Sequence, residues 1–133
     1  MIRGFACGIF DLYHPGHVIM LEECKKHCDY LVIALNSGIN LSLGKNNPIF
    51  TLEERLIILN SVKFIDEIIT YESESELEFI LISGNFQVRF LGEDYLTKEI
   101  TAKDAVEKLV FLNRDHGYST SKLRELIVER SKK

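Results

Sequence analysis

Short apolar runs alternate along the chain with longer segments in which apolar side chains recur at helical spacing. The short runs are rich in β-branched and aromatic residues, so each of them predicts a strand. Most of these runs are apolar on both alternating faces, which is typical of parallel strands covered by helices on both sides. Five strands are predicted, at Ile2–Cys7, Tyr30–Asn36, Glu67–Tyr71, Gln87–Leu91 and Leu109–Asn113.

Helical patterns fall between the predicted strands. Thr51 with Glu54, and Ser75 with Glu78, have the spacing of capping boxes, in which a hydroxyl and a carboxylate satisfy the first helical N–H groups. The predicted helices are His17–His27, Leu52–Ser61, Ser75–Ser83, a weaker one at Thr101–Lys108, and Ser121–Arg130. This alternation predicts an α/β fold with one domain over residues 1–133, a parallel five-stranded sheet and helices on both faces.

Composition and charge narrow the class of protein. The chain has 133 residues, 46% of them hydrophobic, and a formal net charge of -4. Proteins that bind the phosphate backbone usually carry a clustered excess of Lys and Arg, so we expect no nucleic-acid partner. The apolar runs are far shorter than the roughly 20 residues of a membrane helix, and the start lacks the apolar core of a signal peptide. We therefore expect a cytoplasmic protein without a membrane partner.

The cysteines favour a reducing compartment and no metal. Their number is odd, with Cys7, Cys24 and Cys28, which fits free thiols better than a disulfide framework. Cys24, His27 and Cys28 share a helical face, but structural zinc normally takes four ligands. The two helical cysteines fit the buried face of the helix, and no protein-bound metal is predicted.

The segment GIFDLYHPGH, from Gly8 to His17, joins the first predicted strand to the first predicted helix. Gly8 and Gly16 allow the backbone to approach an anion, and the start of a helix offers unpaired N–H groups. His14 and His17 are three positions apart and can converge on one anionic group, to which even a neutral imidazole donates a hydrogen bond. The segment therefore predicts a phosphate site.

A second candidate phosphate site follows the last predicted strand. Arg114 supplies a permanent cation with forked donors, and Gly117 permits a tight turn. Ser119 and Thr120 precede a helix whose N-terminus can hold phosphate groups. The two sites together predict a clamp for a polyphosphate.

Two loops are expected to flank the same crevice. Segment 37–50, which contains Lys45, is long for a compact α/β unit, and such loops are usually functional. Segment Gly92–Tyr95 leaves the carboxyl edge of the sheet, where open α/β folds bind ligands. Arg55 is a candidate for a phosphate contact or for an ion pair with Asp11 or Asp66.

These motifs resemble the signature of the cytidylyltransferase-like nucleotidyltransferases, in the form Gly8-x-Phe10-Asp11-x-x-His14-x-Gly16-His17. The similarity covers nearly the whole chain. It extends to the small bacterial glycerol-3-phosphate cytidylyltransferases through Cys28–Ala34, Glu54–Arg55, Phe64–Ile69, Gly92–Tyr95 and Arg114-x-x-Gly117-x-Ser119-Thr120.

The resemblance implies a fold, a reaction and an assembly. The implied fold is the Rossmann-like HxGH nucleotidyltransferase fold. The implied reaction transfers CMP from CTP, bound with Mg2+, to a small phosphorylated alcohol, first of all glycerol 3-phosphate, and gives CDP-glycerol and pyrophosphate. The implied assembly is a homodimer formed through the region around the second and third strands.

The resemblance also implies roles for individual residues. His14 and His17 would stabilise the α-phosphate, Lys45 would bridge donor and acceptor, and Arg114 would bind the leaving pyrophosphate. Arg55 would join Lys45 in binding the acceptor, while Asp11 would orient the histidines or help to place the metal-bound triphosphate. The implied nucleotide and phosphate contacts are Gly8, Ile9, Phe10, Asp11, Gly16, Gly92, Asp94, Arg114, Gly117, Ser119 and Thr120.

Departures from the family pattern leave alternatives open. Asp115 stands where the cytidylyltransferases have Thr, Ser37-Gly38 replaces a common Ser/Thr-Asp pair, and Tyr95 replaces a Trp. An acceptor other than glycerol 3-phosphate is therefore open. An adenylyltransferase for a sugar phosphate of the heptose-phosphate type is one alternative, and a nucleotide-binding module without turnover is another. Arg114 favours CTP over ATP.

Overall fold

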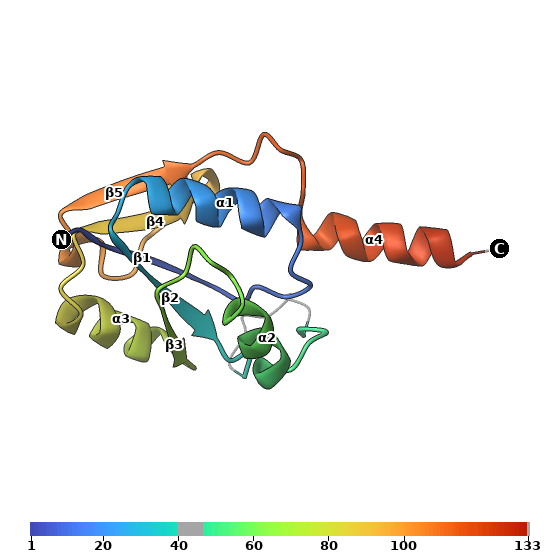
Figure 1. Ribbon diagram of the computed structural model, residues 1–133, viewed down its shortest axis with the longest axis horizontal. Coiled ribbons are helices and arrows are strands. Elements are labelled where there is room, and N and C mark those ends of the chain that lie inside the picture. Colours follow the sequence, from blue (N-terminus) through green and yellow to red (C-terminus); the bar gives the residue numbers. More distant parts are fainter. Residues whose placement is uncertain (40–46, 133) are drawn as a thin grey trace.

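The computed structural model describes residues 1–39 and 47–132 and contains a parallel five-stranded sheet (Figure 1). The strand order is β3-β2-β1-β4-β5, and every pair of neighbours is parallel. The strands are β1 (Arg3–Gly8), β2 (Tyr30–Asn36), β3 (Glu67–Tyr71), β4 (Val88–Gly92) and β5 (Lys108–Leu112). Each predicted strand is confirmed to within one residue at either end.

Helices cover both faces of this sheet. The α-helices are α1 (Pro15–Lys26), α2 (Leu52–Leu59), α3 (Glu74–Ser83) and α4 (Thr120–Ser131). Leu21 of α1 and Leu59 of α2 belong to one apolar cluster, whereas Leu77 and Leu81 of α3 belong to the other. The Rossmann-like α/β fold that the resemblance implied is thereby confirmed.

Strand β2 shows why the sheet needs cover on both sides. Leu31, Ile33 and Leu35 enter the cluster with α1 and α2, and the alternate residues Val32 and Ala34 enter the cluster with α3. All five side chains are fully buried. Burial of a Leu, Ile or Val side chain stabilises the fold by about 1.5–3 kcal/mol each, so the continuous apolar run is what holds the layers together.

The helix predicted at Thr101–Lys108 is wrong. The segment contains only a short 3-10 turn, η2 (Lys103–Ala105), preceded by Ala102 in a left-handed conformation with φ of 53°. A second 3-10 turn, η1 (Glu93–Thr97), follows β4. The left-handed residue interrupts any helix, while Ala102 and Ala105 still pack against the cluster under α3. The segment therefore covers the sheet without helical hydrogen bonding.

Two helix starts also differ from the prediction, because the cap residues lie elsewhere. Helix α1 begins at Pro15, because the side chain of His14 already caps it. Helix α3 is capped by Ser73, whose Oγ accepts from the amide of Glu76 at 3.2 Å, so the predicted box starting at Ser75 is wrong by two positions. The capping box of Thr51 in α2 is confirmed.

The strand order reverses between β1 and β4, and this reversal places the site. Open α/β sheets bind ligands at the carboxyl ends of the strands that flank such a switch point. Here those ends are Gly8 and Gly92. Helix α4 begins beside the start of α1 and projects beyond the sheet (Figure 1). In the described part of the chain no helix has both the length and the apolar character to cross a membrane.

Candidate active site

The turn between β1 and α1 has an unusual backbone. Phe10 and Leu12 have φ of 52° and 50°, in the left-handed region that side chains other than glycine rarely adopt. Each such residue costs on the order of 1 kcal/mol, which the surrounding contacts must offset. Burial of the Phe10 ring, 6% exposed and 5.4 Å from the ring of His17 by centroids, is one such contact. The buried ring thus helps to stabilise the turn in front of α1.

His14 and His17 cap the start of α1 through their own ring nitrogens. Nδ1 of His14 accepts from the amide of Gly16 at 3.0 Å, and Nδ1 of His17 accepts from the amide of His14 at 3.1 Å. Because Nδ1 accepts in each ring, Nε2 carries the proton when the ring is neutral. The ring centroids are 3.9 Å apart. Two N–H donors therefore lie close together at the positive end of a helix, as the sequence predicted.

Thr120 connects this pair to the start of α4. Its Oγ1 lies 3.3 Å from Nε2 of His14 and 3.3 Å from the main-chain oxygen of Asp11. With the proton of His14 on Nε2, His14 donates to the hydroxyl and the hydroxyl donates to the carbonyl. Segments 106 residues apart in the chain are joined in this way, so both predicted phosphate sites meet at one place.

Burial keeps both histidines neutral near pH 7. It lowers the pKa of His17 from 6.5 to about 4, with the charge of His14 as a smaller cause and Asp11 opposing. Burial also lowers the pKa of His14, and the neighbouring His116 lowers it further. Neutral imidazoles at this position act as hydrogen-bond donors through Nε2, and they do not form fixed ion pairs.

Lowering the pH from 7 to 4.5 is expected to destabilise the protein partly through His17. Below pH 6.5 this ring binds a proton in the unfolded chain, whereas in the folded chain it stays neutral until about pH 4. The free energy of unfolding that is present above pH 6.5 is therefore lost progressively as the pH falls. We expect His17→Gln, which keeps a side-chain acceptor for the cap, to reduce this loss by roughly 2 kcal/mol in urea unfolding. Parallel stability curves for the two proteins would contradict this.

Asp11 anchors two segments and does not orient the histidines as we expected. Its carboxylate is 5% exposed and accepts from the amides of Ile49 at 2.7 Å and Phe50 at 2.9 Å. Arg124 of α4 donates to the same carboxylate at 3.0 Å and to the main-chain oxygen of Asn47 at 3.0 Å. The carboxylate thus ties α4 and the segment before α2 to the turn after β1. The main-chain oxygen of Asp11, and not its carboxylate, accepts from Thr120, which in turn contacts His14.

Arg55 is buried, and main-chain oxygens engage most of its donors. Its side chain is 1% exposed and donates to the main-chain oxygens of Phe50, Ile9, Asn36 and Ser37, at 3.2, 3.0, 2.6 and 2.8 Å. These contacts occupy four of its five N–H groups. The guanidinium therefore fixes the ends of three segments, including the turn after β1.

Arg114 lies at the other side of the crevice, over the end of β4. A Cβ built on Gly92 would come within 2.8 Å of Nη2 of Arg114 and 2.5 Å of Oδ1 of Asp94, so only glycine lets both groups approach. Nη2 of Arg114 is 3.5 Å from Oδ1 of Asp94, and the Arg114 side chain is 60% exposed. The exposed guanidinium is within electrostatic range of His17, whose pKa it lowers. Arg114 is thus positioned to meet an anion held at the histidines.

The predicted glycines and caps occupy the expected turns. Gly16 has no room for a side chain, since a Cβ would lie 2.8 Å from Cε1 of His14 and 2.9 Å from Cβ of Tyr118. Gly117 has φ of 78°, which favours glycine. Ser119 caps α4 by accepting from the amide of Lys122 at 3.0 Å. These features bring the starts of α1 and α4 into contact.

Gly8 and Ile9 sit at the end of β1, and Lys45 lies outside the described residues. A Cβ on Gly8 would meet the ring of Phe10 at 3.1 Å, so Gly8 makes room for that ring. The main-chain oxygen of Ile9 is one of the acceptors for Arg55. Both residues therefore support the turn that carries the histidines.

Two residues of this region were missed by the sequence prediction. Arg124 lies one turn beyond Thr120, and its ion pair with Asp11 joins positions 113 apart. His116 lies within 3.0 Å of the Cβ position of Gly16, measured to Cε1. His116 occupies an unspecified position of the motif Arg114-x-x-Gly117-x-Ser119-Thr120, and its place between Arg114 and Gly117 was the signal that could have identified it. Nothing local in the sequence indicated the partner of Arg124.

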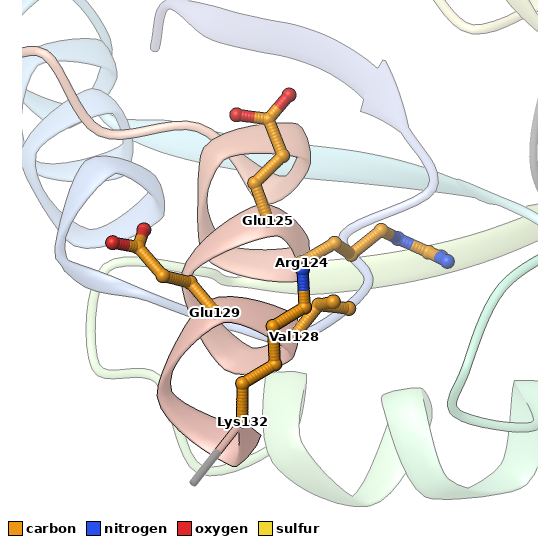
Figure 2. A pocket seen from close by; sticks show the side chains of 5 residues that line it. All are labelled: Arg124, Glu125, Val128, Glu129 and Lys132. Atoms are coloured by element: carbon orange, nitrogen blue, oxygen red, sulfur yellow. The ribbon is translucent and has the colours of Figure 1, made fainter.

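Two shallow cavities lie near the turn. One, of about 500 Å³, runs along α4 and is shown in Figure 2; it holds neither histidine, and Arg124 points away from α4 toward the neighbouring loops. The other, of about 440 Å³, is apolar and adjoins His14. Its lining residues are Tyr13, His14, Pro15, Val18 and Ile19. The second cavity adjoins one of the two histidines, His14, whereas His17 does not line it.

The described residues offer no carboxylate cluster for a metal. No group of three or more His, Cys, Asp or Glu side chains among residues 1–39 and 47–132 could hold an ion. Near the histidines the carboxylate of Asp11 is taken by two amides and Arg124, and Asp94 pairs with Lys98 and Arg114. An arrangement of imidazoles, an arginine and two helix starts suits a polyphosphate and its leaving group.

Comparison with known proteins gives matches over most of the chain. Residues 5–126 match the family model described as cytidylyltransferase-like. The glycerol-3-phosphate cytidylyltransferase of Bacillus subtilis (strain 168) is 35% identical over 121 residues, which are 90% of this chain and 92% of that protein. The bifunctional protein HldE of Gluconacetobacter diazotrophicus is 29% identical over 90% of this chain, but the match spans only 26% of that relative.

Among solved structures, the lipopolysaccharide core biosynthesis protein from Thermoplasma volcanium GSS1 is similar throughout. The TM-score is 0.71 and the sequence identity is 27%, with 86% of this chain and 99% of that chain covered. The match supports the α/β fold described above.

Proposed function

The chain belongs to the cytidylyltransferase-like family, and we propose that it transfers CMP from CTP to glycerol 3-phosphate or a closely similar phosphorylated alcohol. The products would be CDP-glycerol and pyrophosphate. The observation that carries the proposal is the pair of histidines at the start of α1, linked by Thr120 to the start of α4. The B. subtilis relative supports the choice of base and acceptor.

The proposed reaction is an in-line displacement at the α-phosphorus. A phosphate oxygen of the acceptor forms the new P–O bond, and the bond from the α-phosphorus to the bridging oxygen breaks, with its electron pair leaving on pyrophosphate. Such transfers depend mainly on positioning and charge neutralisation, which explains a site without a nucleophilic side chain. The Nε2–H groups of His14 and His17 would stabilise the α-phosphate as charge develops on its oxygens, and for His14 this contact would replace the one to the Thr120 hydroxyl. Arg114, Ser119 and Thr120 would bind the leaving pyrophosphate.

Lys45 and Mg2+ complete the proposal. Lys45 would bridge the acceptor and the triphosphate, a role that rests on the sequence resemblance alone. We propose that Mg2+ enters as the complex of the triphosphate, because the carboxylates near the described site are already paired with amides and cations. The ion would then neutralise phosphate charge as part of the substrate.

An adenylyltransferase acting on a sugar phosphate is the second candidate. This candidate is favoured by the matches to bifunctional HldE proteins, such as that of G. diazotrophicus. Those relatives are longer, and the match covers only part of their length. The histidine pair would serve either base equally, since it would act on the α-phosphate. Arg114 supports the first candidate, as does the B. subtilis relative, which matches over nearly its full length.

Pyrophosphate release tests the proposed function directly. We would measure it with Mg2+ for CTP, ATP, GTP and UTP against glycerol 3-phosphate, phosphoethanolamine, phosphocholine, and ribitol or heptose phosphates. The expected result is turnover with CTP and glycerol 3-phosphate that His14→Ala abolishes. Turnover confined to ATP and a sugar phosphate would replace the first candidate by the second. Tight nucleotide binding without pyrophosphate release from any pair would favour a module that binds without turnover.

A further inference from the structure

His116 is held in a fixed orientation by its own turn. Its Nδ1 accepts from the amide of Tyr118 at 2.9 Å, and its ring stacks on that of Tyr118 with centroids 5.7 Å apart and planes 28° apart. Because Nδ1 accepts, the neutral ring carries its proton on Nε2. Within the described part of the chain that N–H donates to no protein group, so it is available for a ligand.

The ring of His116 also faces the start of α1. A Cβ built on Gly16 would lie 2.8 Å from Cε1 of His14 and 3.0 Å from Cε1 of His116, so both imidazoles border the same small space. The two rings are close enough for a charge on His116 to lower the pKa of His14. Three histidines, from two segments about a hundred residues apart, therefore converge on one helix start.

The position of His116 distinguishes it from the other two histidines. It lies in the turn that leads to Ser119, the cap of α4, and it follows Arg114 by two residues. The groups proposed to hold pyrophosphate thus lie two to four positions from it along the chain. His14 and His17, in contrast, lie at the start of α1, where the α-phosphate is proposed to bind.

We propose that His116 is a third histidine of the site, and that its Nε2–H donates to the pyrophosphate part of the bound nucleoside triphosphate. The inference rests on the proposed function and names a contact within it. The contact exists already in the ground state, so His116 is a binding residue that sets the affinity for the triphosphate. A nucleoside monophosphate, which lacks that part, does not make the contact.

Binding of CTP and of CMP to His116→Phe separates this role from a structural one. Phenylalanine keeps a ring that can stack on Tyr118 but lacks the donor. We expect calorimetry with MgCTP to show about tenfold weaker binding, as for the loss of one hydrogen bond to a charged group, and unchanged binding of CMP. The KM for CTP should rise by a similar factor, with kcat nearly unchanged. His116→Gln, which restores an N–H donor, should recover part of the loss.

His27→Phe is the matched control, because His27 ends α1 at the far end from the site and contacts Glu23. It should bind both nucleotides as the unaltered protein does. Unchanged CTP affinity in His116→Phe, in a protein that still turns over, would overturn this inference alone. Equal losses for CTP and CMP would also overturn it, by showing that the ring only shapes the turn. If the unaltered protein bound neither CTP nor pyrophosphate, the proposed function would fail together with it.

Discussion

His14→Ala is expected to lower kcat about 100- to 1,000-fold while the affinity for CTP changes only a few-fold. Loss of one donor that stabilises charge developing in the transition state typically has this effect on kcat. Nε2 of His14 carries the proton because Nδ1 accepts from Gly16, so the ring presents its donor whenever it is neutral. A contact that strengthens in the transition state affects kcat more than ground-state binding. Steady-state kinetics and calorimetry with CTP give the two quantities.

The control for this variant is His14→Asn. Asparagine is a good N-cap, so it can replace Nδ1 in accepting from Gly16, whereas alanine removes the cap at a cost of about 1 kcal/mol. We expect His14→Asn to unfold at the urea concentration of the unaltered protein and yet to remain as inactive as His14→Ala. Activity recovered by the asparagine variant would show that the histidine acts as a helix cap and not on the phosphate.

Asp11→Ala is expected to lower the free energy of unfolding by about 3 kcal/mol. The carboxylate is buried, and its removal leaves the amides of Ile49 and Phe50 without their acceptor and Arg124 without its counter-charge. Partly buried polar groups are costly to leave unpaired, and here three of them lose a partner at once. Urea unfolding measures the loss. Activity should also fall, because α4 and the segment before α2 are both released from the turn that leads to the histidines.

Asp66→Ala is the comparison for Asp11→Ala. Asp66 also accepts from a backbone amide, that of Leu31 at 2.8 Å, and pairs with Lys25, but its side chain is 32% exposed. Water can replace its partners, so the expected loss of stability is about 1 kcal/mol and activity should be retained. Equal losses of stability in the two variants would contradict the anchoring role of Asp11.

The sequence predicts the sheet well because the signal there is local. β2 is a continuous apolar run, and the structure buries both of its faces. The cap of α2 is equally local, since Thr51 and Glu54 bond each other's backbone within one turn. The segment after η1 was misassigned because Ala102, a strong helix former, adopts a left-handed conformation where the chain packs on the sheet. Tertiary packing overrode local propensity at that point.

The candidate site was predicted in part. The features that depend on neighbouring residues were predicted, and those that depend on contacts between remote segments were not. The histidine turn and the Ser119 cap are local motifs that the fold places together through Thr120. Whether a charged residue in such a region faces a ligand or a carbonyl depends on segments that are remote in the sequence. Arg55 illustrates this, because its acceptors lie up to 46 positions away. The same holds for Asp11, whose partner Arg124 belongs to the last helix.

The fate of the α-phosphate tests the central claim most directly. CTP labelled with 32P either at the α- or at the γ-phosphate would be incubated with Mg2+, glycerol 3-phosphate and the protein, and the products separated by chromatography. The account predicts that the α-label enters a CDP-alcohol while the γ-label appears in pyrophosphate, in equal amounts, and that His14→Ala forms neither. A γ-label released as orthophosphate, or an α-label that stays in CTP or CMP for every acceptor and nucleotide tried, would contradict nucleotidyl transfer.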